Sequence, residues 1–78
     1  MARTKDERFI ICAYETATSS GDLYEPLDRY AIGEKVGINR KGVDTICRLL
    51  AQANFIKPVG KTEFKLTDNG KDLAESFA

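Results

Sequence analysis

Five side chains that can bind nucleic acid lie close together in the middle of the sequence. Asn39, Arg40 and Lys41 are consecutive, and Thr45 and Arg48 follow at spacings of four and three residues. Arginine and lysine neutralise phosphates, arginine can also grip a guanine bidentately, and asparagine and threonine contact bases or backbone. The N–H groups at a helix start bind phosphate as well. These residues therefore predict a face that can bind phosphate, although the same pattern is compatible with an ordinary solvent-facing surface.

Asp44 lies inside the same run and complicates this prediction. Its carboxylate repels phosphate, yet it can pair with Arg40 or Arg48, each four residues away, or accept from a cytosine amine. An acidic residue here favours weak or selective binding over indiscriminate affinity.

Three further lysines, Lys57, Lys61 and Lys65, lie where the apolar residues alternate. Alternation on both sides of Gly60-Lys61-Thr62 predicts a small hairpin with Lys61 at its tip. Lysines on edge strands also prevent sheet-to-sheet aggregation, which is the structural explanation for them. We predict that they contact phosphate.

The charges are unevenly distributed along the chain. Twelve basic and twelve acidic residues give its 78 residues a net charge of zero, whereas strong nucleic-acid binders are usually basic overall. Residues 39–65 nevertheless carry six basic and two acidic side chains, while residues 1–38 and 66–78 each carry two more acidic than basic ones. Any attraction for DNA must come from the central third.

Catalytic chemistry has little support in the sequence. Histidine is absent, and Cys12 and Cys47 match no metal or redox spacing and have no activating neighbour. We therefore expect no enzymatic activity, no cofactor and no metal. The longest apolar run spans residues 9–13, far short of the roughly 20 residues of a membrane span. Without a recognisable secretory segment, we expect a cytoplasmic protein with reduced cysteines.

Helix signals surround the central run. Asp28 can cap a helix that ends at Gly37, and Asn39 can cap a second helix that continues to about residue 53. An earlier amphipathic helix capped by Thr4 leads into a loop at 19–26, and Thr67 can cap a last helix. The predicted order is helix, helix, helix, hairpin, helix, an α+β domain. The stripe that should be buried in the second central helix is Val43, Ile46, Cys47 and Leu50.

The central stretch resembles a helix-turn-helix motif. Such a motif needs a small residue early in its first helix and a glycine at the corner four residues later, met here by Gly33 and Gly37. Related motifs usually have alanine where Gly33 stands. The apolar positions agree at Ile32, Val36, Ile38, Val43 and Ile46. The basic hairpin and the run Leu66-Thr67-x-x-Gly70-x-x-Leu73-Ala74 look like the wing and closing helix of winged helix-turn-helix transcriptional regulators.

The resemblance implies one winged helix-turn-helix domain over residues 1–78, with the helix-turn-helix at about 29–53, the wing at about 55–66 and the last helix at about 68–77. It implies sequence-specific or general binding of double-stranded DNA and regulation of transcription, with the second helix of the motif in the major groove. The side chains expected at DNA are Asn39, Arg40, Lys41, Thr45, Arg48, Lys57, Lys61 and Lys65.

The resemblance also limits the expected partners. A single module covers one half-site, so we expect a homodimer or a larger assembly, formed through the first or last helix. No segment for sensing a small-molecule effector is evident. The alternative is a winged-helix module that binds protein and not DNA, because fold does not fix function.

Overall fold

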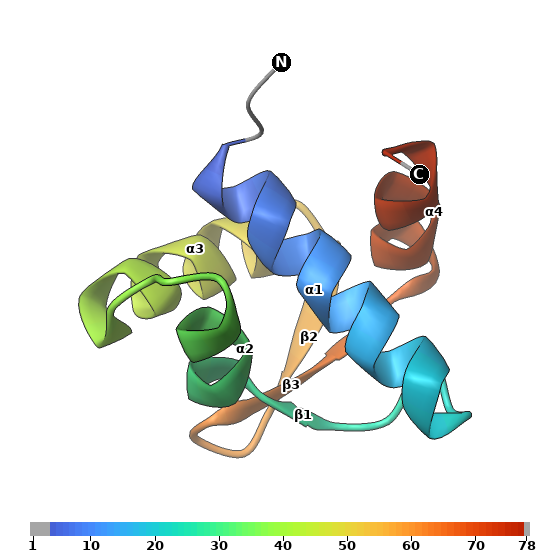
Figure 1. Ribbon diagram of the computed structural model, residues 1–78, viewed down its shortest axis with the longest axis horizontal. Helices are drawn as coiled ribbons and strands as arrows, with labels where there is room; N and C mark the ends of the chain where they lie inside the picture. Colours follow the sequence, from blue (N-terminus) through green and yellow to red (C-terminus); the bar gives the residue numbers. More distant parts are fainter. Residues whose placement is uncertain (1–3, 78) are drawn as a thin grey trace.

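Four helices and a three-stranded antiparallel sheet make up the computed structural model, which describes residues 4–77 (Figure 1). The α+β class therefore agrees with the sequence-based prediction. The sheet order is β1-β3-β2. The elements in chain order are α1 (Lys5–Ser20), β1 (Leu27–Asp28), α2 (Arg29–Lys35), α3 (Arg40–Gln52), β2 (Ile56–Val59), β3 (Glu63–Leu66) and α4 (Asp68–Ser76).

All four helices begin at the capping residues predicted from the sequence. The side chains of Thr4, Asp28, Asn39 and Thr67 each accept a hydrogen bond from a backbone N–H in the first turn. These bonds satisfy N–H groups that have no partner within a helix. Local sequence alone therefore determines where each helix starts.

The corner between α2 and α3 is a Schellman motif. The Ile38 N–H donates to the Gly33 carbonyl at 2.8 Å, and the Gly37 N–H donates to the Glu34 carbonyl at 3.2 Å. Gly37 has φ of 75°, in the left-handed region that this motif requires and that glycine adopts without strain. The predicted role of Gly37 is confirmed.

The end of α3 has the same geometry. Asn54 has φ of 64°, and the Phe55 N–H donates to the Leu50 carbonyl at 2.9 Å. The prediction that Asn54 terminates this helix is confirmed. The two hydrogen-bonded ends fix the direction in which the chain enters and leaves α3.

The predicted hairpin is present as β2 and β3. Phe64 and Leu66 are buried on its inner face, and Pro58 lies in the edge strand β2, where its missing N–H is tolerated. The sequence-based order nevertheless lacked one strand. Leu27 and Asp28 pair with Phe64 and Glu63 as β1, and a strand of two residues has no periodicity that a sequence could reveal.

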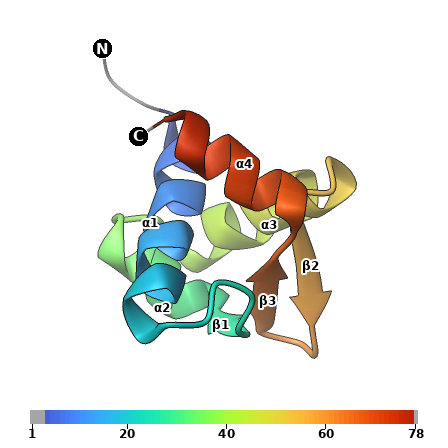
Figure 2. The same ribbon diagram turned by 90° about the vertical axis from the view of Figure 1, so that its right-hand side faces the viewer.

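The core is enclosed by the helices and the inner face of the sheet, and α1 and α3 contribute most of its buried residues. The rings of Phe9 and Phe64 are fully buried, with centroids 5.4 Å apart and planes tilted by 34°. α1 crosses the middle of the molecule, with α4 on one side and α2 and α3 on the other (Figure 1). In the view turned by 90°, α4 lies beyond the open end of the hairpin, away from the turn that joins β2 and β3 (Figure 2). This arrangement leaves one side of α3 exposed.

Candidate nucleic-acid interface

The exposed side of α3 carries a ridge of polar residues. Lys41, Thr45, Arg48 and Gln52 are all exposed, and their spacing of four, three and four residues places them on one helix face. The opposite face consists of the predicted stripe of Val43, Ile46, Cys47 and Leu50, all buried. Gln52 was not among the predicted site residues, although the same helical spacing could have identified it.

The start of α3 positions two more of the predicted residues. Asn39 accepts from the Gly42 N–H at 2.8 Å, which occupies its side-chain oxygen and leaves its NH₂ group to donate. The Arg40 guanidinium lies 4.6 Å from the centre of the Tyr30 ring. A cation over an aromatic ring is held there by the ring quadrupole, so Arg40 has a defined position at the corner.

Asp44 has different partners from those suggested by the sequence. It was expected to pair with Arg40 or Arg48 on its own helix. Instead, the Tyr30 hydroxyl donates to Asp44 Oδ1 at 2.7 Å, and Arg29 Nη1 lies 3.8 Å from the same oxygen. Both partners come from α2, so only the crossing of the two helices reveals them. The pKa of Tyr30 is raised above its ordinary value, mainly by the hydrogen bond to Asp44 and secondarily by burial.

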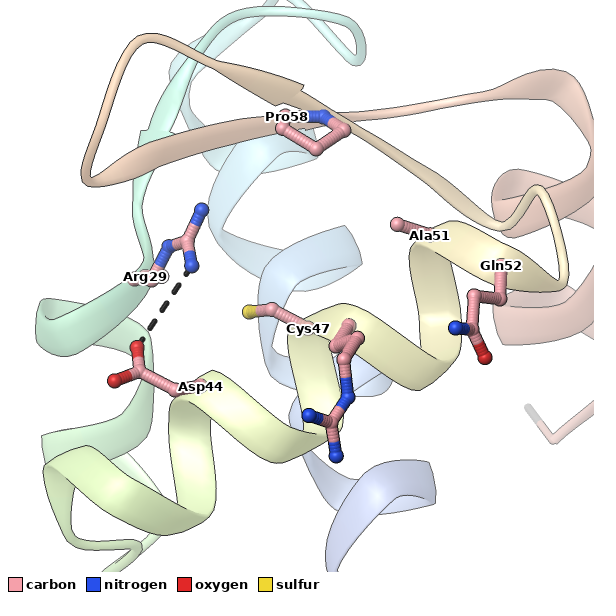
Figure 3. A pocket seen from close by; sticks show the side chains of 7 residues that line it. Arg29, Asp44, Cys47, Ala51, Gln52 and Pro58 are labelled. Atoms are coloured by element: carbon pink, nitrogen blue, oxygen red, sulfur yellow. Dashed lines mark ion pairs between the residues drawn. The ribbon is translucent and has the colours of Figure 1, made fainter.

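A groove of about 380 Å³ separates α3 from the hairpin (Figure 3). The Arg29–Asp44 ion pair lies at one end and Gln52 at the other. The Arg29 side chain is only 15% exposed, and among the described residues its buried Nε has no hydrogen-bond partner. The groove is lined by Arg29, Asp44, Cys47, Arg48, Ala51, Gln52 and Pro58.

Two of the predicted hairpin lysines lie apart from α3. Lys57 and Lys65 are directly opposite each other in the β2–β3 register, and the alternation of a strand places both on the face away from buried Phe64. They line a different depression, together with Tyr24 and Asp68. The structure therefore does not bring Lys57 and Lys65 together with the α3 ridge.

Lys61 is exposed at the turn of the hairpin. This turn is tied to the start of α2, because the Arg29 N–H donates to the Thr62 carbonyl at 3.0 Å. The hairpin tip thus has a fixed position relative to α2 and, through the corner, to α3. Of the eight predicted residues, the structure places Asn39, Arg40, Lys41, Thr45 and Arg48 on or beside α3, Lys61 at the tip, and Lys57 and Lys65 on the outer face of the sheet.

Cys47 lies in the groove, but its environment makes it unreactive. It is 3% exposed, and burial raises its pKa from an ordinary value of 9.0 to about 11. Because the thiolate is the nucleophile, a buried thiol of high pKa reacts slowly. Cys12, which is free and partly exposed, is the more accessible of the two.

Alkylation with iodoacetamide at about pH 8 should therefore modify Cys12 first and Cys47 only after unfolding.

The raised pKa of Cys47 also determines how the stability of the fold changes with pH. The contribution of Cys47 is complete below pH 9.0 and is lost as the pH rises to about 11, because only the unfolded chain releases this proton in that range. Urea unfolding of Cys47→Ala should show a smaller loss of stability over that range than the unchanged protein. Equal losses of stability in Cys47→Ala and the unchanged protein would contradict the raised pKa of Cys47.

Among residues 4–77, no helix is long and apolar enough to cross a membrane. Within the same range, no three histidine, cysteine or acidic side chains gather as a metal site would require. No protein-family model, curated protein or solved structure matches this chain.

Proposed function

We propose that this chain is a winged helix-turn-helix domain that binds double-stranded DNA, with α3 in the major groove. The observation that carries the proposal is the exposed α3 ridge of Lys41, Thr45, Arg48 and Gln52. All four side chains can contact phosphate or base edges, and Leu49, 52% exposed, lies beside them on the same side of α3.

The dimensions of α3 suit this role. Its 13 residues correspond to a length of about 20 Å, and the major groove, about 12 Å wide, admits one α-helix. In this arrangement Arg40 and Lys41 neutralise phosphates at the helix start. Thr45 and Arg48 reach base edges, and Arg48 can bind a guanine through two hydrogen bonds.

The hairpin supports the winged form of the proposal. It follows α3 directly and is anchored to the first N–H of α2 through Thr62. As a wing, it would bring Lys61 to the neighbouring phosphate backbone. Lys57 and Lys65 point from the outer face of the sheet, so we assign them a smaller contribution than Lys61.

The salt dependence of DNA binding tests the proposal. If Arg40, Lys41 and Lys61 contact phosphate, log K against log salt concentration should have a slope of about −2.7 on mixed-sequence duplex DNA, because each contact releases about 0.9 counterion. Replacing Arg40 and Lys41 together by alanine should make the slope less steep by about 1.8. Fluorescence anisotropy between about 20 and 150 mM salt measures both values.

The matched control is Arg8→Ala with Lys35→Ala, which also removes one arginine and one lysine. Both residues are exposed and lie outside the α3 ridge, and Lys35 contacts Thr16 of α1. This variant should keep nearly the original slope. Absence of binding at about 20 mM salt, where screening is weak, would refute the DNA proposal. Amide shifts confined to α1 or α4 on addition of a protein partner would then favour the protein-interaction alternative.

A further inference from the structure

Tyr30 connects the two oppositely charged residues at the start of α3. Its hydroxyl donates to Asp44 at 2.7 Å, and its ring lies under Arg40 at 4.6 Å. Arg40 and Asp44 are four residues apart on the same helix, a spacing at which opposite charges commonly pair. Here Tyr30 engages each of them separately.

We propose that Tyr30 is a positioning residue for DNA binding. Its hydroxyl holds the Asp44 carboxylate against α2, and its ring holds the Arg40 guanidinium at the corner. Arg40 therefore keeps its N–H groups available for a phosphate of the DNA backbone, and Asp44 is kept from competing for them. This inference rests on the proposed function of the α3 ridge.

The second contact of Asp44 is too weak to replace the first. Arg29 Nη1 is 3.8 Å from Asp44 Oδ1, beyond the distance of a normal hydrogen bond. Asp44 is also substantially exposed, with 55% of its side chain accessible. Without the hydroxyl of Tyr30, the carboxylate can turn toward Arg40 or Arg48, each one helical turn away, and its charge opposes an approaching phosphate.

The test is a double-mutant cycle of Tyr30→Phe and Asp44→Asn, with affinity for mixed-sequence duplex DNA measured at low salt. Tyr30→Phe keeps the ring under Arg40 and removes only the hydroxyl, so it should weaken binding about three- to five-fold. Asp44→Asn should strengthen binding by a similar factor, because it removes a negative charge that repels the phosphate backbone. In the Asp44→Asn background, Tyr30→Phe should have almost no effect. Equal weakening in both backgrounds would overturn the proposal.

Tyr14→Phe provides the matched control. The Tyr14 hydroxyl donates to Glu75 Oε2 at 2.8 Å, which joins α1 to α4 away from the α3 ridge. This exchange removes the same kind of hydrogen bond, so it should leave DNA affinity unchanged. A loss of affinity equal to that of Tyr30→Phe would show that the effect is a general loss of stability, and would overturn the positioning role.

A measurement without DNA separates this inference from the proposed function. The Arg40 Nε–Hε resonance should shift in Tyr30→Phe, as Asp44 turns toward the guanidinium, but not when Tyr30→Phe is combined with Asp44→Asn. An unshifted resonance in Tyr30→Phe would refute the positioning role whatever the DNA result. A shifted resonance in a protein that does not bind DNA would instead refute the proposed function.

Discussion

Replacing Gly70 by alanine is expected to destabilise the domain by about 3 kcal/mol, near the upper end of what overpacking usually costs. A Cβ at this position would lie 1.9 Å from the Phe55 carbonyl oxygen and 3.0 Å from its carbon. Neither Phe55 nor the start of α4 can shift without disturbing a hydrogen bond. The Phe55 N–H donates to the Leu50 carbonyl, and the N–H of Thr67, the cap of α4, donates to the Phe55 carbonyl at 3.2 Å.

Urea or thermal unfolding measures the effect, which corresponds to a lowering of Tm by roughly 15 °C in a domain of this size. Gly60→Ala is the control, since it makes the same exchange where nothing lies within 4 Å of the new Cβ. Gly60 has φ of 64°, so alanine there should cost only about 1–2 kcal/mol. Equal costs at the two positions would contradict the close packing of α4 on Phe55.

Replacing Gly33 by alanine is expected to cost about 2 kcal/mol, even though alanine is usual at the corresponding position of the motif that this stretch resembles. A Cβ on Gly33 would lie 2.2 Å from Val43 Cγ2. Val43 is 1% exposed, and a β-branched side chain in a helix has essentially one rotamer. The sequence indicated only that a small residue is needed at this position, which alanine would also satisfy. The structure shows that an added methyl has no room.

The partner residue provides a rescue experiment. Val43→Ala alone should cost about 2 kcal/mol, because it leaves a cavity at the crossing of α2 and α3. In that background Gly33→Ala should be neutral or stabilising, since the new methyl fills the vacated space and alanine favours the helix by about 1 kcal/mol. Chemical unfolding of the unchanged protein, the two single variants and the double variant gives the coupling energy between Gly33 and Val43. Costs that simply add would show that Gly33 and Val43 do not share this space.

Gly33 and the proposed DNA surface depend on the same geometry, the crossing of α2 and α3. Gly33 lets α3 cross close to α2, which brings Tyr30 within reach of Arg40 and Asp44. A variant that separates the helices should therefore lose stability and also the positioning of Arg40. For this reason DNA measurements are best made on Tyr30→Phe and Asp44→Asn, which leave the crossing intact.

The local features of this protein could be read from its sequence. The four caps, the left-handed Gly37 and Asn54, and the buried stripe of α3 all depend on residues within one or two helical turns of each other. Side-chain hydrogen bonds to nearby N–H groups and helical periodicity need no distant partner. The exposed face of α3, with Lys41, Thr45 and Arg48, follows from the same periodicity.

The sequence could not determine the contacts between helices and strands that are far apart in the chain. The pairing of Leu27 with Phe64 joins segments 37 positions apart in the chain, and the partners of Asp44 come from another helix. The sequence grouped Lys57 and Lys65 with the α3 residues, whereas the pleat of the sheet directs them elsewhere. Composition and spacing thus determined which residues could meet a phosphate. Only the packing of α2 against α3 and of the hairpin beside them decided which of those residues share a surface, because that choice depends on distances through space and not along the chain.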